Sequence, residues 1–436
     1  MSKVPPTIKG VRGAPDILPA EVGRWQRVET EARRILESFG YEEIRTPVFE
    51  RTELFVRGIG EGTDIVQKEM YTFTDKGGES LTLRPEATAA VVRAAHEHSL
   101  LSEGRPLKVY YIGSMFRHER PQAGRFRQFH QIGVEAMGVE GPTVDAEMLA
   151  LLLHLFTKWG LPDLELRLNS IGDPVCRPSY VERLTTFLHS RKAKLCPDCQ
   201  GRLDRNPLRV LDCKTPGCRA VTANAPKSVE SLCRPCADHF QRLRELLDAL
   251  EVTYELDPHL VRGLDYYTRT TFELVNPALG AQNAVAGGGR YDGLAQEITG
   301  TAVPGIGFAI GLERVVASLA AKGEDQASLG DRPHEGVFVA TLGPEPDRHG
   351  FLLAQRLRRA GVRTGLDLTG TGNRSLRSQL RQADKERFRY CLILGEDELK
   401  KGEATLKDME GGGQEAIPLD RVVDHLTRVE PGEPRR

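Results

Sequence analysis

Two strand-like runs joined by an arginine-rich loop constrain the fold of this chain more than any other feature. The first run, Val109–Phe116, is rich in β-branched and aromatic residues, and the second alternates apolar residues from Phe126 to Val134. Such a pair predicts a β-hairpin. Cationic residues lie on and between its strands, namely Arg117, His118, Arg120, Arg125, Arg127 and His130. Because a guanidinium binds phosphate or carboxylate oxygens two at a time, the hairpin predicts a polyanion site.

Polar residues on the second strand extend this prediction to a small polar molecule. Gln131 and Glu135 are four residues apart on one strand and therefore share a face. A buried carboxylate such as that of Glu135 can accept an N–H group of a ligand. A solvated basic hairpin without a ligand is the alternative, but it does not account for the other motifs of the chain.

Length and charge limit the classes of protein to consider. A chain of 436 residues predicts about three domains. The net charge of -1 gives no global basic field, so any binding of nucleic acid has to be local. The sequence has no apolar run long enough to span a bilayer and no segment like a signal peptide, which predicts a cytoplasmic protein without a membrane partner.

The pattern along the chain predicts a core in two parts, residues 1–172 and 258–322, with an insertion between them. Apolar periodicity predicts helices over 20–39, 86–98 and 145–159, and strand patterns cover 41–49, 81–83 and 164–168. After the insertion, strands are expected over 260–275, 284–286 and 305–310, and a helix over 312–321. Pro47 predicts an edge or interface position for the strand 41–49, because proline has no N–H for a sheet ladder.

The last part of the chain predicts a separate domain. Residues 323–334 have the composition of a linker. Strands then alternate with helices, with strands expected over 336–342, 362–368 and 390–394 and helices over 347–360 and 375–383. This alternation predicts a parallel or mixed α/β domain over residues 335–430.

The insertion, residues 173–257, contains seven of the eight cysteines. In a cytoplasmic protein they are expected to be thiols or metal ligands. Two Cys-x-x-Cys pairs separated by about thirty residues are typical of a structural tetrahedral zinc site. The predicted ligands are Cys196, Cys199, Cys233 and Cys236, with Cys213 and Cys218 as further candidates. The zinc would fold the insertion and take no part in catalysis; unpaired thiols without a metal are the alternative.

Three arginines stand beside small residues near expected strand ends and helix starts. Arg117 begins the hairpin loop, Arg262 begins the segment Arg-Gly-Leu-Asp-Tyr-Tyr, and Arg314 follows the glycine-rich run 305–313. Glycine lets the backbone approach a ligand and a helix N-terminus favours anions, so the set predicts a triphosphate in an extended groove. We find no nucleophile–base pair, and catalysis is expected to rest on positioning and charge stabilisation.

A second glycine-rich segment is Gly287-Gly288-Gly289-Arg290. It lacks the Gly-Lys-Ser/Thr of a Walker loop, and its contiguous glycines do not match a dinucleotide fingerprint. The segment predicts a backbone wall close to a small substrate, with a tight turn as the structural alternative.

These stretches together resemble the histidyl-tRNA synthetases, a family of class II aminoacyl-tRNA synthetases. The segment 40–47 is similar to motif 1 of the class, residues 116–135 to motif 2 and residues 305–314 to motif 3. The segments 262–267 and 287–292 are those that single out the histidine enzyme within the class. The resemblance covers nearly the whole chain.

The resemblance implies an α+β catalytic core on a six-stranded antiparallel sheet, interrupted by the small cysteine-rich insertion and followed by a C-terminal α/β anticodon-binding domain. It also implies a homodimer. Histidine would react with ATP, accompanied by Mg²⁺, to give histidyl-adenylate and pyrophosphate. The histidyl group would then pass to the 3′ end of the histidine tRNA.

The resemblance further implies roles for individual residues. Arg117 would hold the α-phosphate and the histidine carboxylate, Arg262 would act as a fixed cation at the α-phosphate, and Arg314 would bind the γ-phosphate. Glu119 would also contact ATP, and Phe129 would stack on adenine. The implied histidine-binding residues are Glu86, Ala87, Thr88, Gln131, Glu135, Tyr266 and Tyr267.

Two alternatives remain at this point. A paralogue of this fold is a non-catalytic regulatory subunit of ATP phosphoribosyltransferase; such paralogues usually lack the C-terminal domain and have eroded motifs, whereas this chain keeps the three arginines and an α/β segment after His334. The other alternative is a class II synthetase for threonine or proline, against which the segment 262–267 argues.

Overall fold

The computed structural model describes residues 7–101, 105–122, 124–322, 334–368 and 374–429. The chain divides into two compact units, residues 1–329 and 330–436. Each unit is described by itself. The linker predicted over 323–334 lies, apart from His334, outside the described residues.

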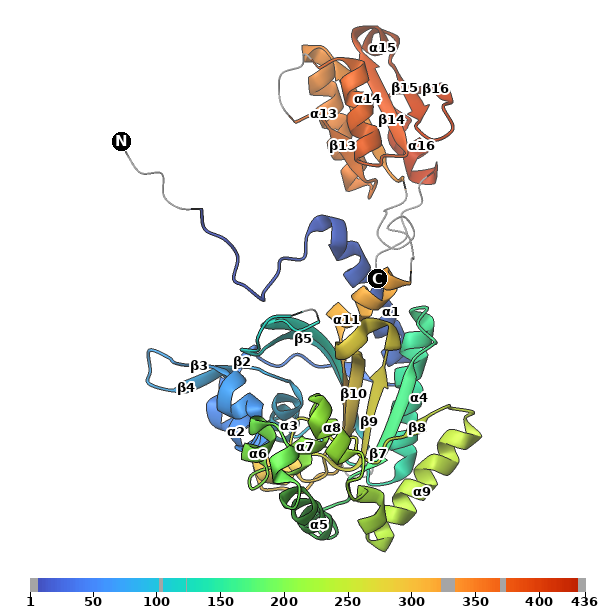
Figure 1. Cartoon of the computed structure of the whole chain (residues 1–436). Helices are drawn as coiled ribbons and strands as arrows, with labels where there is room; N and C mark the ends of the chain where they lie inside the picture. The colour runs from blue at the N-terminus through green and yellow to red at the C-terminus, as the bar shows by residue number, and fades with distance from the viewer. Residues whose placement is uncertain (1–6, 102–104, 123, 323–333, 369–373, 430–436) are drawn as a thin grey trace, which may run out of the picture. The chain divides into compact units, whose positions relative to one another are not determined.

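The first unit is built on a sheet of eight strands among the described residues, drawn in Figure 1. Their order across the sheet is β1 (Glu42–Glu43), β5 (Leu107–Phe116), β6 (Gln128–Met137), β11 (Gly305–Gly311), β10 (Ala284–Arg290), β9 (Thr268–Val275), β7 (Glu165–Ser170) and β8 (Glu255–Leu256). The inner strands, from β5 to β7, are all antiparallel, which confirms the predicted sheet. The sheet is larger than the predicted six strands because β1 and β8 each add a short parallel edge.

The strand predicted over 41–49 is broken. Only Glu42–Glu43 pairs with the sheet, and the chain next forms a strand at β2 (Phe49–Arg51). Pro47 lacks the N–H group that a ladder needs. The carbonyl groups of the intervening segment are bonded instead by the guanidinium of Arg84, which donates to Thr46 O at 3.0 Å and to Pro47 O at 3.4 Å.

One face of the large sheet carries the main hydrophobic core. Large side chains such as Ile132, Phe272 and Phe308 alternate along the strands and are fully buried. They pack against the helices α1 (Pro19–Ser38), α4 (Pro142–Lys158), α9 (Arg234–Ala249) and α11 (Leu312–Ala321), of which α4 and α9 lie side by side (Figure 1). Each such side chain contributes about 1.5–3 kcal/mol by leaving water.

The centre of the opposite face, on β6, β10 and β11, is lined by smaller residues. Gly133, Gly287, Gly307 and Ala309 occupy facing positions on β6, β10 and β11. The elements that flank this face are α2 (Thr52–Ile59), α3 (Thr88–Glu97), α10 (Leu294–Thr299) and a small sheet of β2, β4 (Ser80–Leu83) and β3 (Tyr71–Thr74). A π-helix, η1 (Ile65–Glu69), lies between α2 and β3 in the chain. The difference between the faces leaves room for a site on this second face.

The insertion is largely helical. Its elements are α5 (Arg177–His189), η2 (Lys192–Lys194), α6 (Pro197–Arg202), α7 (Leu208–Leu211), α8 (Pro216–Thr222), η3 (Ser228–Ser231) and α9. Several of these helices begin with a proline in the first turn, where the missing N–H has no intrahelical partner to lose. The short helices enclose a second hydrophobic cluster, which includes Tyr180, Leu184 and Cys199.

A buried ionic network joins the insertion to the core. Asp145 on α4 and Arg290 on β10 are both fully buried, and Oδ1 of Asp145 lies 2.5 Å from Nη1 of Arg290. Asp145 also contacts His239 of α9 at 2.9 Å and accepts a hydrogen bond from Thr270 at 2.6 Å. Removing one partner of such a network leaves an uncompensated buried charge, which destabilises a protein by about 3–5 kcal/mol. Arg290 therefore fixes the fold rather than facing a substrate.

The second unit is a mixed sheet in the order β13 (Thr364–Leu366), β12 (Val337–Leu342), β14 (Tyr390–Gly395), β15 (Glu403–Asp408) and β16 (Gln414–Pro418). Its helices are α13 (Pro344–Arg359), α14 (Leu376–Lys385), α15 (Glu396–Lys401) and α16 (Val422–Val429). The first three strands are parallel and the last two antiparallel, which confirms the predicted α/β domain. Over the whole described part of the chain, we find no helix that combines the length and the apolar character a membrane crossing requires.

Candidate active site

A cavity of about 230 Å³ opens on the glycine-lined face of the large sheet. Strands β5, β6, β9, β10 and β11 form its floor, and the segment that precedes β9 forms part of its wall. The side chains with polar groups that line it include Glu86, Thr88, Arg117, Glu119, Gln131, Glu135, Arg262, Tyr266, Tyr267, Glu273, Tyr291, Glu313 and Arg314.

Glycines in the floor make room for these side chains. A Cβ at Gly307 would overlap the carboxylate of Glu135, and one at Gly287 would meet the guanidinium of Arg262 at 2.5 Å. Any side chain at either position would displace the charged group beside it. The small-residue pattern of β10 and β11 therefore determines where the charged groups lie.

Glu135 is at the centre of a buried hydrogen-bond network. Its Oε1 accepts from the hydroxyl of Thr88 at 2.7 Å, and its Oε2 accepts from the hydroxyl of Tyr291 at 2.7 Å. Burial raises the pKa of Glu135 to about 8, although both hydrogen bonds act in the opposite direction. The carboxyl group is thus poised to exchange a proton near neutral pH.

Glu86 lies close by at the start of α3. Its carboxylate accepts from the backbone N–H groups of Thr88 at 2.7 Å and Ala89 at 3.0 Å, so it caps the helix. Burial raises its pKa. Gln131 on β6 leaves its buried Oε1 without a hydrogen-bond partner among the described residues. A buried acceptor without a partner is rare and indicates a ligand group or water at that point.

Aromatic rings form one wall of the cavity. The ring centroids of Tyr266 and Tyr267 lie 4.7 Å apart. The ring of Tyr291 lies edge-on to that of Tyr266, with 6.0 Å between the centroids. Burial raises the pKa of Tyr267, so its hydroxyl stays protonated at neutral pH. These rings present flat apolar surfaces together with hydroxyl donors, a combination that suits a small polar ring.

Arg262 and Arg117 supply fixed positive charge. Arg262 donates from Nη1 to Oε1 of Glu273 at 2.6 Å, which holds the guanidinium across the floor of the cavity. Arg117 donates from Nε to the carbonyl oxygen of Pro85 at 2.9 Å and lies over the ring of Phe129, 5.3 Å from its centroid. Both arginines are therefore oriented before any ligand arrives.

A third arginine, Arg314, also lines the cavity. Arg314 donates to the carbonyl oxygens of Ala284 and Gly124, and its neighbour Glu313 accepts from the backbone N–H of His130 at 2.9 Å. Burial lowers the pKa of Arg314, and the nearby Arg125 adds to this effect. An anion would relieve the repulsion between these two cations.

The arrangement has two chemically different ends. Arg117, Arg262 and Arg314 offer planar donors to a polyanion, as phosphate groups require. Glu135, Gln131 and the tyrosines offer acceptors, donors and a flat wall to a small nitrogen-containing molecule. The cavity therefore suits a polyanion and a small nitrogen-containing molecule bound together.

The sequence-predicted substrate residues all line this cavity except Ala87, which is buried in a hydrophobic cluster. Further lining residues were missed, among them Tyr291, Glu273 and Glu313. Tyr291 and Glu313 lie inside the motifs already singled out, but the sequence does not tell which alternate residue of a motif faces the cavity. The pairing of Glu273 with Arg262 depends on the β9–β10 register.

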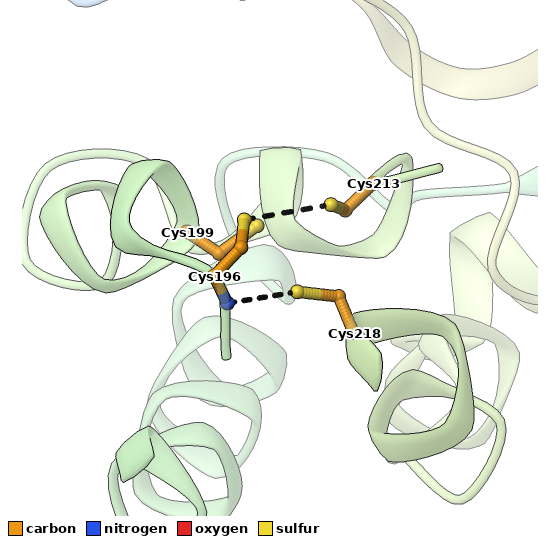
Figure 2. Close-up of side chains that lie close together, drawn as sticks. All are labelled: Cys196, Cys199, Cys213 and Cys218. Carbon is orange, nitrogen blue, oxygen red and sulfur yellow. Dashed lines mark hydrogen bonds between the residues drawn. The ribbon is translucent and has the colours of Figure 1, made fainter. Parts of the chain in front are cut away.

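The cysteines of the insertion form two groups. The sulfur atoms of Cys196, Cys199, Cys213 and Cys218 all lie within 4.8 Å of one another, and Figure 2 shows these side chains converging from α6, α8 and the segment between them. Cys233 and Cys236 instead lie with Asp173 and Cys176. The single quartet Cys196, Cys199, Cys233 and Cys236 expected from the two Cys-x-x-Cys pairs is therefore wrong, because the helices between the pairs direct each to a different partner pair.

Comparison with known proteins identifies two family models along the chain. One, described as histidyl-tRNA synthetase, matches residues 13–315, and the other, an anticodon binding domain, matches residues 337–428. The histidine–tRNA ligase of Moorella thermoacetica is 51% identical over 421 residues, covering 96% of this chain and 97% of that protein. The histidine–tRNA ligase of Syntrophotalea carbinolica is 52% identical over 420 residues, covering 96% and 98%.

Two solved structures resemble this chain in fold, one of them a histidyl-tRNA synthetase. The crystal structure of apo histidyl-tRNA synthetase from S. aureus matches with a TM-score of 0.80 and 37% identity, covering 96% of this chain and all of that chain. A structure from Bacillus halodurans, described as an ATP phosphoribosyltransferase regulatory subunit/histidyl-tRNA synthetase, shares the fold with a TM-score of 0.64 at 19% identity.

Proposed function

The chain belongs to the histidyl-tRNA synthetase family and is a histidine–tRNA ligase, and we propose that histidine and ATP bind and react in the cavity on the sheet. A carboxylate oxygen of histidine attacks the α-phosphorus of ATP, a new P–O bond forms and pyrophosphate leaves. The histidyl group then passes to the 3′ end of the tRNA, and AMP is released. The observation that carries the proposal is the convergence of Arg117, Arg262 and Arg314 with Glu135 in one cavity.

The arginines would bind the phosphate chain. Arg262, held by Glu273 at 2.6 Å, would lie at the α-phosphate, where negative charge develops as the nucleophile attacks. Arg117 would hold the α-phosphate and the histidine carboxylate together, and Phe129 beneath it would stack on adenine. Arg314 would bind the γ-phosphate, which its closeness to the cation Arg125 favours.

The acid and amide groups would bind histidine. Glu135 and Tyr267 would contact the imidazole, with Tyr266 as part of the wall. Glu86, Thr88 and Gln131 would hold the α-amino group. Although Glu86 already accepts two backbone N–H groups, a carboxylate has about four acceptor positions, so it can still accept from an ammonium group.

Mg²⁺ would enter with ATP. This ion keeps most of its water and binds mainly to substrate phosphates, with one or two carboxylates from the protein. Glu119 suits the role of a protein carboxylate near Mg²⁺ because it lines the cavity beside Arg117. Its Oε2 lies 3.1 Å from Nη1 of Arg125, which orients the side chain. The ion would offset negative charge on the phosphates. The arginines would still position the reacting groups.

A zinc ion would stabilise the insertion at Cys196, Cys199, Cys213 and Cys218. A tetrahedral zinc with bonds of about 2.3 Å holds its sulfur ligands about 3.8 Å apart. The Sγ atoms of Cys196 and Cys213 lie 3.9 Å apart, which supports this assignment. All eight cysteines of the chain are free of disulfide bonds. The ion would serve folding and not the reaction.

A homodimer and a cytoplasmic location complete the proposal. Val48, Phe49 and Phe73, close to motif 1, leave 43%, 50% and 44% of their surfaces exposed, and exposed apolar residues that cluster indicate a contact surface. The second unit would bind the tRNA, and the exposed Arg377 and Arg381 on α14 suit its phosphates. Free thiols and a tRNA substrate both fit a reducing compartment.

The proposal is tested by rapid quench of the protein mixed with labelled histidine and ATP, followed by addition of tRNA. We expect one equivalent of histidyl-adenylate per cavity before tRNA is added, and its transfer to tRNA afterwards. Binding of histidine without formation of adenylate would instead indicate a regulatory protein that only senses the amino acid.

A further inference from the structure

A second group of potential metal ligands lies at the junction of the insertion and the large sheet. It consists of Asp173, Cys176, Cys233 and Cys236, whose ligand atoms all lie within 4.8 Å of one another. We propose that this group, hereafter the junction site, binds a second zinc ion that fastens the insertion to the start of β9. This site is separate from the four-cysteine group, with which it shares no residue.

The spacing of the ligand atoms fits zinc. With Zn–S bonds of about 2.3 Å and Zn–O bonds of about 2.1 Å, a tetrahedral site separates sulfur from oxygen by about 3.6 Å. Oδ1 of Asp173 lies 3.4 Å from Sγ of Cys176 and 3.9 Å from Sγ of Cys233. Three thiolates favour a soft ion, so zinc is expected in preference to Mg²⁺ or Ca²⁺.

The backbone around the junction site holds the ligands in place. Oδ1 of Asp173 accepts from the N–H groups of Val175 at 3.0 Å and Cys176 at 3.3 Å, which fixes the turn after β7. Such outer contacts orient a carboxylate ligand toward its metal. Cys176 directly precedes α5, and Cys233 directly precedes α9. Two helix N-termini therefore converge on the site, and their positive ends favour thiolate anions.

The charge around the junction site is also suitable. Three thiolates and one carboxylate carry a charge of −4, so bound Zn²⁺ leaves −2. Arg269 provides one compensating cation, with its Nη2 3.8 Å from Oδ2 of Asp173. Arg177 provides another, since it follows Cys176 directly in the chain. Binding of the metal ionises the three thiols, and their protons pass to solvent.

The junction site is linked to the active-site wall by hydrogen bonds. Arg177 donates from Nη2 to the carbonyl oxygen of Tyr267 at 2.5 Å. The backbone N–H of Arg269 donates to Gly172 O at 2.7 Å, and Ile171 N donates to Arg269 O at 2.8 Å. Arg269 has a φ of 49°, a conformation that an arginine adopts only when its surroundings hold it. The zinc would therefore position Tyr267; this consequence rests on the proposed histidine pocket, whereas binding of the metal does not.

Metal counting on the full-length protein tests the inference. After equilibration with zinc and gel filtration, elemental analysis is expected to give two equivalents in the unaltered chain. Cys176→Ser and Cys213→Ser should each hold one, and the double variant none. A single equivalent in the unaltered chain that Cys176→Ser retains would overturn the junction site. Cys391→Ala, which removes a buried thiol outside both groups, is the control and should keep both ions.

A spectroscopic measurement on the unaltered chain keeps the test valid if Cys176→Ser does not fold. X-ray absorption at the zinc edge should give a mean of between three and four sulfur ligands per zinc, with an oxygen contribution. Four sulfurs and no oxygen would exclude Asp173 and overturn the proposal.

Kinetics test the linkage to Tyr267 separately. We expect Cys176→Ser to raise the KM for histidine by about tenfold while that for ATP changes little, because a small misplacement of one binding wall is enough for such a loss. Equal changes in both values would refute the positioning role but leave the metal count intact. Failure of the unaltered chain to activate histidine would refute the proposed function and likewise leave the metal count intact.

Discussion

At the scale of single residues, burial changes the acid–base chemistry of Glu135. Its pKa of about 8 in the folded protein compares with about 4.3 in an unfolded chain, so the native state binds an extra proton between these values. The stabilising contribution of this proton is fully present below about pH 4.3 and is lost as the pH rises to about 8.

This shift predicts a pH-dependent difference between the wild-type chain and Glu135→Gln. The amide resembles the protonated acid and does not titrate, so the free energy of unfolding of the variant should fall less between pH 5 and pH 8. Urea denaturation across this range measures the difference. Parallel stability curves for the two proteins would mean that Glu135 is ionised throughout.

Arg262 is the residue on which the chemical step depends most. We expect Arg262→Ala to reduce kcat for histidine-dependent ATP–pyrophosphate exchange by about 10²–10³-fold, as does the loss of one donor at a developing charge. The substitution also leaves Glu273, its partner at 2.6 Å, without a counter-ion.

Two further variants separate these effects of Arg262. The double variant Arg262→Ala/Glu273→Ala removes the unpaired carboxylate and should remain as slow as the single one. Arg242→Ala, in which an exposed arginine on α9 is lost, should retain full activity. Recovery of activity in the double variant would assign the defect to the unpaired Glu273 and not to a missing cation.

The charged residues of the site could be predicted from the sequence because the residue type alone specifies a guanidinium or a carboxylate group. Arg117, Arg262 and Arg314 all line the cavity. The groups that hold them could not be predicted in this way. Glu273 and Tyr291 become partners of Arg262 and Glu135 only through the register of the sheet and the path of the chain after β10.

At the scale of elements, the faces of β10 and β11 determine the shape of the site. Glycine at position 307 lies directly beneath the carboxylate of Glu135. Gly307→Ala should therefore displace Glu135 and raise the KM for histidine at least tenfold, with a smaller effect on ATP, and overpacking should destabilise the fold by about 1–3 kcal/mol.

The matched control for Gly307→Ala is Gly23→Ala on α1. No heavy atom lies within 4 Å of its added methyl group, so binding of both substrates should be unchanged. Separate titrations with histidine and ATP measure the effect. A loss of ATP affinity as large as that for histidine would indicate general damage to the sheet and would contradict the placement of histidine at Glu135.

Helices and strands that follow from the periodicity of neighbouring residues formed over nearly the predicted ranges. Features that depend on partners distant in the sequence differed from their predictions. The helix 312–321 and the two hairpin strands follow from periodicity alone. The strand predicted over 260–275 begins only at Thr268, because the preceding segment instead lines the cavity through Arg262 and Tyr266. The two cysteine groups were likewise beyond prediction, since their composition depends on how short helices pack.

At the scale of the whole molecule, all lining residues of the cavity belong to the first unit. Removal of residues 330–436 should therefore preserve histidine-dependent exchange while reducing charging of tRNA. The same preparation measures both activities, with the full-length chain as the reference. Equal loss of exchange and charging in a truncated protein with an intact far-UV spectrum would show that the second unit is needed for activation.

Whether the cavity joins histidine to ATP can be measured by amino-acid-dependent ATP–pyrophosphate exchange with each of the twenty amino acids in turn. We expect exchange with histidine alone, since Glu135, Tyr267 and Gln131 suit an imidazole and an α-amino group. No exchange with any amino acid, or exchange with threonine or proline in place of histidine, would contradict it.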